Sequence, residues 1–386
     1  MSKVNSLEDI HRRFSTSHFG EDEYYTGITD TNIDFELQYP FPYPLDKIYP
    51  EGESNKVNIS FSNIVFNNII RLTDTDTFLN FEDCHFYGEV DCTNTKFLNK
   101  IRFRNCHFHK EVKFINTTFN DLADFYTCHF YKKMIFYKTD FMQTAVFSEV
   151  EFHENVLFTY TLINKLIIFR GTIFIKGLDL SLSILSGNVS VFDIQLDDYE
   201  VLSEKLNKEG YEKSVSEIGD IPIKNKRETF RILRKTFEVN SDYIHSLDYK
   251  KLELHTYDKI LDQNINTGEN VWSSRFNKFI LTLNRKSNLY GTRFEYGIRF
   301  TFLIGLFFFY FSYINLNTIE FAAPCQWSYG LFEDFSINFL KFLNPVHSVD
   351  YLGQQHSLLF YFFDYLGRIF VGYGIYQTVQ AFRKYK

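Results

Sequence analysis

The chain has 386 residues, enough for two or three domains and a sizeable core. Its net charge is −7 and no basic stripe or arginine-rich run is present, so the composition does not indicate a nucleic-acid-binding protein. Five cysteines in a chain of this length do not predict a disulfide framework. Phe occurs 45 times, and this bias suggests an internal repeat.

Residues 1–56 precede the repeat, and we expect them to form an N-terminal extension or cap. The first residues carry no apolar stretch after their charges, so no secretory signal is expected. The part of the chain that precedes the first membrane segment should therefore stay in the cytoplasm.

Residues 57–190 carry large apolar side chains at a fixed spacing. One series starts at Phe86 and another at Phe81, and each continues at every eleventh residue; sixteen of the twenty positions are Phe. The steps from one series to the other alternate between five and six residues. A small residue stands two positions before each mark, and Cys alternates with Thr before the first series, so the full period is 22 residues. The Phe side chains predicted to fill the core are Phe86, Phe97, Phe108, Phe119, Phe130, Phe141, Phe152, Phe103, Phe114, Phe125, Phe136, Phe147 and Phe158.

The period excludes the usual regular structures. A spacing of 5.5 residues keeps no single face of a helix, whose turn has 3.6 residues, and the segments are too short for hairpin strands. A square coil with four short sides fits, because each side then sends one large and one small residue inward. Equivalent sides stack at about 4.8 Å, the spacing of neighbouring strands.

The five-residue side resembles the pentapeptide-repeat proteins, whose usual motif is Ala-(Asp/Asn)-Leu-x-x. Phe replaces Leu here, as at Phe97 in Thr95-Lys-Phe and at Phe141 in Thr139-Asp-Phe, and the extra residue on alternate sides departs from a strict five. The resemblance implies a right-handed quadrilateral β-helix with about 22 residues per coil. Such proteins usually present surfaces and seldom catalyse reactions. We therefore expect no enzyme, and predict no catalytic, cofactor-binding or metal-binding residue.

The rest of the chain is expected to form three further segments. Residues 191–225 lose the register and should form a C-terminal cap or loop, and residues 226–290 should form a helical connector. Residues 291–386 are predicted to form a membrane hairpin with spans at about 298–319 and 356–382. The first span contains no charge and is long enough to cross the hydrocarbon core, although a buried core helix would look similar.

Flanking charges predict the orientation of the two spans. Basic residues precede the first span and follow the second, whereas the loop of about 320–355 contains only one Lys against four acids. Both termini should therefore be cytoplasmic, in a multi-pass protein of the inner cell membrane. Apolar residues within the loop recur at helical spacing and predict an interfacial or re-entrant helix. They are Trp327, Leu331, Phe335, Phe339 and Phe342.

The combination of solenoid, helical connector and hairpin resembles a group of bacterial pentapeptide-repeat membrane proteins. The segments that carry this likeness are residues 287–291, Ser-Asn-Leu-Tyr-Gly, and residues 368–383 at the end of the chain. The resemblance implies an architecture more than an activity.

The second span contains the polar residues Asp364, Arg368, Gln377 and Gln380. Asp364 and Arg368 are four residues apart and share a helix face, so they form either an ion pair that fastens the helices or part of a water-lined pore. Residues 371–374, Val-Gly-Tyr-Gly, match part of a potassium-channel filter, but too few residues follow for a full membrane helix. Glycines that permit close helix packing are the favoured interpretation.

The tripeptide Cys-His-Phe recurs at Cys84, Cys106 and Cys128 and raises the question of a metal site. Adjacent side chains point to opposite sides of a strand, so the cysteines should face the core and the histidines should form an external ladder. A tetrahedral zinc site needs convergent ligands, and small-residue packing is therefore the favoured role of the cysteines.

Three functions fit these features. The leading hypothesis is a membrane-anchored cytoplasmic interaction or scaffold protein, whose solenoid binds an unknown protein partner or a second copy in a homo-oligomer. The alternative is an oligomeric ion channel or membrane-disrupting effector gated by the solenoid, suggested by the charged second span. A third reading, a DNA-mimicking topoisomerase protector, is known among soluble pentapeptide-repeat proteins, but the anchor and mixed surface charge argue against it.

Overall fold

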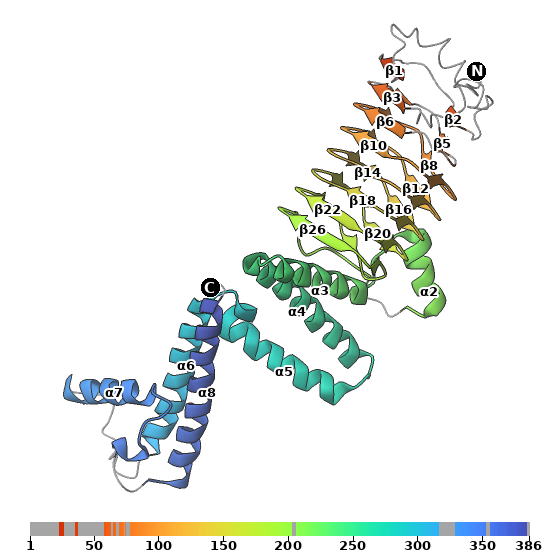
Figure 1. Cartoon of the computed structure of the whole chain (residues 1–386). Coiled ribbons are helices and arrows are strands. Elements are labelled where there is room, and N and C mark those ends of the chain that lie inside the picture. The colour runs from red at the N-terminus through yellow and green to blue at the C-terminus, as the bar shows by residue number, and fades with distance from the viewer. Residues whose placement is uncertain are drawn as a thin grey trace. The chain divides into compact units, whose positions relative to one another are not determined.

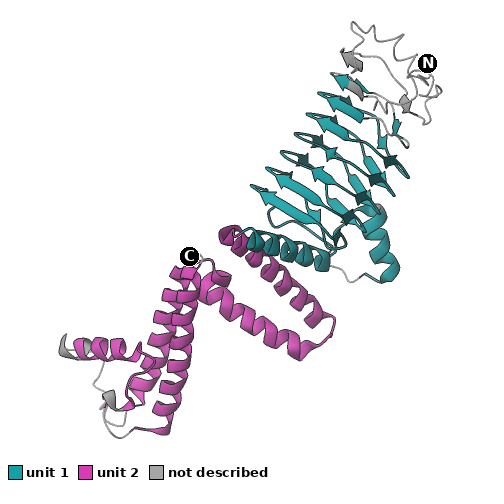
Figure 2. Cartoon of the chain, viewed as in Figure 1, with its two compact units in different colours: residues 1–240 teal, residues 241–386 magenta. Residues whose placement is uncertain are grey.

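The computed structural model of the chain (Figure 1) describes residues 23–26, 35–37, 58–62, 65–66, 69–72, 74, 78–202, 206–315, 329–352 and 356–383. The chain forms two compact units, Met1–Asn240 and Ser241–Lys386 (Figure 2). The boundary between the units falls inside the segment that the sequence assigns to a single connector, residues 226–290. Each unit is described by itself.

The first unit is a β-solenoid, which confirms the predicted fold class. Its short parallel strands form four sheets, which the chain visits in a fixed order and which we number I to IV (Figure 1). Sheet I contains β1 (Glu23–Thr26), β3 (Asn58–Ser62), β6 (Phe78–Glu82), β10 (Ile101–Arg104), β14 (Ala123–Asp124), β18 (Thr144–Val146), β22 (Leu166–Arg170) and β26 (Asn188–Phe192). Sheet II contains β4 (Val65–Phe66), β7 (His85–Phe86), β11 (His107–Phe108), β15 (His129–Phe130), β19 (Glu151–Phe152) and β23 (Ile173–Phe174).

The other two walls of the coil are built in the same way. Sheet III contains β2 (Phe35–Leu37), β5 (Ile70–Leu72), β8 (Val90–Asp91), β12 (Val112–Ile115), β16 (Met134–Tyr137), β20 (Val156–Thr159) and β24 (Leu178–Asp179). Sheet IV contains β9 (Lys96–Phe97), β13 (Thr118–Phe119), β17 (Asp140–Phe141), β21 (Leu162–Ile163) and β25 (Ile184–Leu185). Strands β1 and β2 continue sheets I and III into the segment expected to be only an extension or cap.

The strand register follows the 22-residue period from Phe81 onward. Phe108 pairs with Phe130 and Phe119 with Phe141, each a full coil apart. The first coil is shorter, because Phe61 pairs with Phe81 and Val65 with His85. The shortening lies between Leu72 and Phe81, because Phe66 and Leu72 keep the six-residue step of Phe86 and Cys92 in the next coil.

The interior of the solenoid is made of stacked Phe rings. Successive rings of one sheet lie nearly parallel, with centroids 4.6 Å apart for Phe86 and Phe108 and 5.0 Å apart for Phe125 and Phe147. Rings of neighbouring sheets meet edge to face, as Phe103 does with Phe108 at 5.5 Å. All thirteen Phe residues named from the sequence are buried. Each buried ring contributes about 2–3 kcal/mol through removal of its surface from water.

Two kinds of corner explain the alternation of five and six residues. Every eleventh residue from Asp83 to Tyr160 has a positive φ, and Gly171 continues the series. These residues lie in the five-residue steps, where a left-handed residue closes a tight turn. The six-residue steps show no positive φ in the described residues and use one more residue in its place. Asn94, Asn105 and Asn116 suit the tight corner, because Asn tolerates this conformation better than most residues.

The Cys and Thr residues at the small interior positions of sheets II and IV are hydrogen-bond donors, whereas Val150 occupies one such position without a donor. The Thr117 hydroxyl donates to the Cys92 carbonyl at 2.7 Å, and the Cys128 thiol donates to the Phe103 carbonyl at 3.1 Å. The acceptor belongs to the preceding coil in each case, so these donors satisfy buried carbonyls that the corners leave outside the strand ladder. The need for a small donor explains why Cys and Thr occupy equivalent positions.

Helices close the C-terminal end of the first unit. The segment expected to be a loop-rich cap contains α2 (Lys208–Lys213) and the π-helical turn η2 (Ser214–Ile218), followed by α3 (Ile223–Val239). The Val215 carbonyl accepts a hydrogen bond from the Thr159 hydroxyl at 3.1 Å, so η2 lies on the outer side of sheet III. Phe230 and Leu233 of α3 are fully buried.

Polar contacts hold α3 against the last coil. The Asn225 amide donates to the Asp179 carboxylate at 2.8 Å, and the Leu180 amide N–H donates to the Thr229 hydroxyl at 2.9 Å. Burial raises the pKa of Asp179 above its ordinary value.

The second unit is helical. Its elements are α4 (Tyr243–Asn266), α5 (Val271–Asn288), η3 (Leu289–Gly291), α6 (Phe294–Ile314), α7 (Tyr329–Phe342), η5 (Val349–Leu352) and α8 (Leu358–Phe382). Two of these helices, α6 and α8, are long and apolar enough to cross a membrane. They begin and end close to the predicted spans, except that α6 starts four residues earlier and residues 316–319 lie outside the described part of the chain.

Candidate functional site

The outer wall of sheet II carries a column of aromatic and imidazole rings. His85, His107 and His129 stack one coil apart, with ring centroids at 4.6 and 4.7 Å and interplanar angles of 5° and 1°. A second column runs beside them, in which the Tyr87 and His109 rings lie 4.2 Å apart at an angle of 4°. The wall is therefore a flat surface of stacked rings with polar edges.

Two imidazoles of this wall, those of His107 and His109, have lowered pKa values. Burial, together with the neighbouring His129, His85 and His109, lowers the pKa of His107 to about 4. Burial and His85 also lower the pKa of His109. A proton on His107 would face the neighbouring imidazoles at about 5 Å, so the neutral form of His107 is the stable one at pH 7.

The Cys and His side chains of each Cys-His pair point to opposite sides of their strand, which bears on whether they could share a metal ion. Cys84, Cys106 and Cys128 are fully buried, whereas the histidines that follow them lie on the outer wall, as the alternation of side chains along a strand predicts. The two ligands of each pair therefore cannot converge on one ion. Burial raises the pKa of the Cys106 thiol well above its usual value, which keeps the thiol protonated and able to donate. In the part of the chain that the structure describes, no group of three or more His, Cys, Asp or Glu side chains could hold a metal ion.

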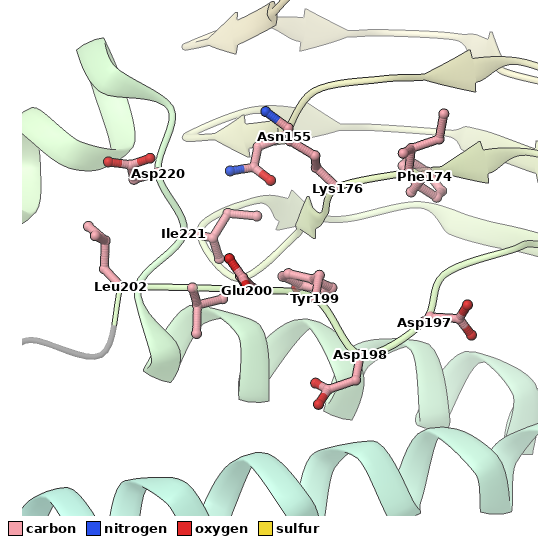
Figure 3. A pocket seen from close by; sticks show the side chains of 12 residues that line it. Asn155, Phe174, Lys176, Asp197, Asp198, Tyr199, Glu200, Leu202, Asp220 and Ile221 are labelled. Atoms are coloured by element: carbon pink, nitrogen blue, oxygen red, sulfur yellow. The ribbon is translucent and has the colours of Figure 1, made fainter.

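A cleft of about 570 Å³ lies at the capped end of the solenoid (Figure 3). It is lined by Asn155, Phe174, Ile175, Lys176, Asp197, Asp198, Tyr199, Glu200, Val201, Leu202, Asp220 and Ile221. The Tyr199 ring forms part of its floor, and the hydroxyl donates to the Leu178 carbonyl at 2.6 Å.

The acidic side chains of this cleft have separate roles. The Asp198 carboxylate pairs with the ammonium group of Lys226, which is 1% exposed and also lies 4.5 Å from the centre of the Tyr199 ring. Asp197 and Asp220 point away from Asp198 (Figure 3). These three aspartates therefore do not converge on one point of the cleft.

The outer surface of the α6–α8 hairpin is apolar. Large side chains on both helices are more than half exposed, among them Leu303 and Ile369, each at 65%. In the most apolar 18-residue stretch of each helix, only 28% is buried inside the protein. A core helix of a soluble protein would be mostly buried, so this exposure distinguishes the two helices from the alternative of buried core helices.

Small residues bring α6 and α8 into close contact through a reciprocal pair. A Cβ added to Gly297 would lie 2.4 Å from the Thr378 hydroxyl oxygen, and one added to Gly374 would lie 2.3 Å from the Thr301 hydroxyl oxygen. Each helix therefore places its Gly against the Thr of the other helix, as small residues do where helix backbones approach closely. The Thr hydroxyls donate back to their own helices, Thr301 to the Gly297 carbonyl at 2.8 Å and Thr378 to the Gly374 carbonyl at 2.9 Å.

The polar residues of α8 face inward, and they form two clusters. In the first, Asp364 is fully buried and accepts from Arg368 at 2.8 Å, as the four-residue spacing predicts. The other carboxylate oxygen lies 2.9 Å from Nε2 of His347. Sequence reasoning missed His347, because it comes from the segment after α7 and no spacing rule connects it to α8.

The second cluster joins the end of α5 to the C-terminal half of α8. The fully buried Asn288 amide donates to Gln377, and the Ser287 and Tyr373 hydroxyls lie 3.4 Å apart. These contacts connect the two segments that carry the likeness to the bacterial membrane group, residues 287–291 and 368–383. Gln380 is half-buried on the same helix.

The filter-like residues 371–374 lie inside the continuous helix α8. Gly374 and Gly367 take part in close packing, the latter against Phe308 and Phe342. Gly372 does not, because the nearest atom to an added Cβ would be the Pro345 Cβ at 3.8 Å.

The helix predicted for the loop region is present as α7. Phe339 and Phe342 are buried against α6 and α8. Trp327 lies outside the described residues.

Comparison with known proteins agrees with the geometry of the first unit. A family model described as pentapeptide repeats (9 copies) matches residues 93–132. The solenoid of this chain is therefore a pentapeptide-repeat solenoid, with Phe in the central position. No curated protein and no solved structure matches the chain.

The close contact at Gly374 leads to a direct test of the hairpin. We expect Gly374→Ala to lower the stability of the second unit by about 1–3 kcal/mol, because the added methyl group meets the Thr301 Cα at 3.1 Å as well as its hydroxyl. Gly372→Ala, two residues away on the same helix, is the matched control and should not destabilise. Thermal unfolding of both variants in detergent measures the difference. Equal stability of the two variants would contradict the packing described here.

Proposed function

We propose that this protein is a membrane-anchored scaffold, in which the α6–α8 hairpin spans a lipid bilayer and the solenoid binds a protein partner. The observation that carries the proposal is the inverted polarity of the hairpin. Exposed apolar side chains cover its outside, while the polar Asp364 and Gln377 of α8 are buried. Lipid is the solvent that suits such a surface.

The distribution of basic residues favours cytoplasmic termini. Arg293 and Arg299 lie at the start of α6, and Arg383 follows the end of α8, so all three gather at one end of the hairpin. The described part of the connecting loop has Lys341 as its single Lys or Arg. By the positive-inside rule the end with the two termini of the hairpin faces the cytoplasm.

The solenoid is suited to display a rigid surface. Neighbouring coils are tied together on the outside by pairs one coil or so apart, such as Lys113 with Glu89 at 2.5 Å and Lys176 with Glu154 at 2.5 Å. Sheet III is partly covered by η2, but the ring columns of sheet II are open. Aromatic side chains are enriched at protein interfaces, and this wall displays Tyr87 and Tyr131 among stacked imidazoles, so we assign partner binding to sheet II. A second copy of the chain is one such partner.

The ion-channel alternative finds less support. Asp364 and Arg368, the charges that suggested a pore, pair with each other and with His347 within one copy of the chain. The pairing of Asp364 with His347 favours a packing role, because it fastens α8 to the segment that follows α7.

Membrane fractionation and thiol labelling test the anchor. The full chain should stay in the membrane pellet after alkaline carbonate extraction. In a Cys325→Ser background, Val346→Cys should react with a membrane-impermeant maleimide in intact cells, whereas Val239→Cys should react only after permeabilisation. Val346 and Val239 are highly exposed, at 85% and 84%. A difference in labelling therefore reports which side of the membrane each position lies on. Release by carbonate, or labelling of Val239→Cys from outside, would contradict the proposal.

Photocrosslinking in native membranes tests the scaffold surface. A photoreactive Phe analogue in place of Tyr87, 47% exposed on sheet II, should capture a defined partner. The same analogue in place of Leu98, 54% exposed just after β9 of sheet IV, is the control, since sheets II and IV are opposite walls. Mass spectrometry of the adduct identifies the partner or a second copy. Equal capture from the two walls, or none from Tyr87, would argue against sheet II as the binding surface.

A further inference from the structure

Helix α5 presents an apolar face that remains exposed. Trp272 is 84% exposed, Phe276 65%, Phe279 56% and Ile280 47%. Their spacing of four, three and one residues places them on one side of the helix. The opposite side packs against α4, with Leu281 buried in a cluster that includes Leu261.

The charges of α5 are all of one sign. The helix contains Arg275, Lys278, Arg285 and Lys286 and no Asp or Glu. Two of these are used inside the unit, because Lys278 and Arg285 pair with Asp258 of α4 at 3.7 and 3.3 Å.

The remaining two basic residues, Arg275 and Lys286, border the exposed apolar face. They are eleven residues apart, which is close to three helical turns, so they lie on the same stripe beside Phe279. Neither forms an ion pair with the residues that the structure describes. Lys286 and Arg275 are both exposed and free to meet an anionic group.

Contacts at the end of α5 fix this helix at one end of the hairpin. Ser287 and Asn288 contact Tyr373 and Gln377 of α8, and the Arg285 carbonyl accepts from the N–H of Leu289, the residue that caps the helix. The turn that follows is specific, because Leu289 and Tyr290 both have a positive φ, and α6 begins at Phe294. The C-terminal end of α5 is therefore held beside the hairpin end that carries Arg293 and Arg383.

We propose that α5 is an in-plane membrane helix that binds the anionic surface of the bilayer from which the hairpin emerges. Trp272, Phe276 and Phe279 insert at the boundary between headgroups and acyl chains, and Arg275 and Lys286 contact lipid phosphates. An aromatic face bordered by basic residues is the pattern of interfacial helices, and Trp prefers this depth of the bilayer. The inference rests on the proposed function, since the hairpin must span the bilayer for α5 to lie at its surface.

Lipid suits this face better than a protein partner for two reasons. The helix is joined to the hairpin by a short turn, so a surface at the level of the headgroups is always within reach. A negative leaflet also complements a helix that carries four basic and no acidic residues, with the attraction falling off over about one Debye length.

Tryptophan fluorescence of the reconstituted full chain tests the proposal. Trp272 and Trp327 are the two tryptophans, so Trp327→Phe leaves Trp272 as the sole reporter. The protein is reconstituted in vesicles of phosphatidylcholine, with or without phosphatidylglycerol. We expect a blue-shifted emission in anionic vesicles and strong quenching by lipids brominated near the headgroup end of the acyl chain.

Charge reversal separates electrostatic binding from simple burial. Arg275→Glu with Lys286→Glu should reduce the quenching in anionic vesicles by about half or more, because each basic residue near the surface strengthens binding on the order of five-fold. Lys235→Glu with Lys251→Glu, at exposed positions on α3 and α4, makes the same change in net charge and should leave the quenching unchanged. High salt should weaken the effect in the parent protein.

The possible outcomes distinguish the two proposals. A chain that resists carbonate extraction but shows a red-shifted, unquenched Trp272 overturns the inference about α5 and leaves the anchor intact. A chain that carbonate releases overturns the anchor itself. A blue-shifted Trp272 that bromolipids do not quench, with emission that changes on dilution in detergent, would assign the face to a second copy and overturn lipid binding.

Discussion

Parallel strands and stacked aromatic rings share one spacing, and the first unit depends on this match. Strands of neighbouring coils lie about 4.8 Å apart, and offset-stacked rings prefer a similar separation. The rings of Phe86 and Phe108 and those of Phe108 and Phe130 are each 4.6 Å apart. A column of identical residues can therefore fill the core without any ring leaving its preferred geometry. The same spacing stacks the histidines outside and places the Thr and Cys donors beneath the carbonyls of the coil before.

The second unit has the opposite distribution of polar and apolar side chains between its surface and its interior. The solenoid hides aromatic rings and exposes paired charges, whereas the hairpin exposes aromatic and aliphatic side chains and hides Asp364 with its two partners. Removal of one member of such a buried ionic group costs about 3–5 kcal/mol, because the remaining charge is left unpaired. Each surface fits its own solvent, and within the second unit the contact of Asn288 with Gln377 fastens the end of α5 to α8. A chain built in this way is suited to hold a rigid protein-binding surface at a membrane.

The amino-acid sequence predicts those features that repeat or that lie within one helix. The Phe columns, the 22-residue coil and the Asp364–Arg368 pair all follow from spacing. The corners do not, because Lys138, Glu149 and Tyr160 take the left-handed conformation without a side chain that favours it; only their position in the repeat reveals them. Contacts between distant segments, such as His347 with Asp364 and Gly297 with Thr378, also leave no local pattern. The shorter first coil does not follow from the repeat either. Phe61 pairs with Phe81, and this separation of 20 residues is not a multiple of eleven.

The most direct test of the stacked core is a pair of double-mutant cycles on the full chain in detergent, read by urea unfolding of the solenoid. Phe108→Leu with Phe130→Leu changes rings one coil apart, whereas Phe108→Leu with Phe119→Leu changes rings on opposite walls, half a coil apart. We expect a coupling energy of about 0.5–1.5 kcal/mol for the first pair and none for the second. Coupling that is stronger for Phe108 and Phe119 than for Phe108 and Phe130 would contradict the 22-residue stack.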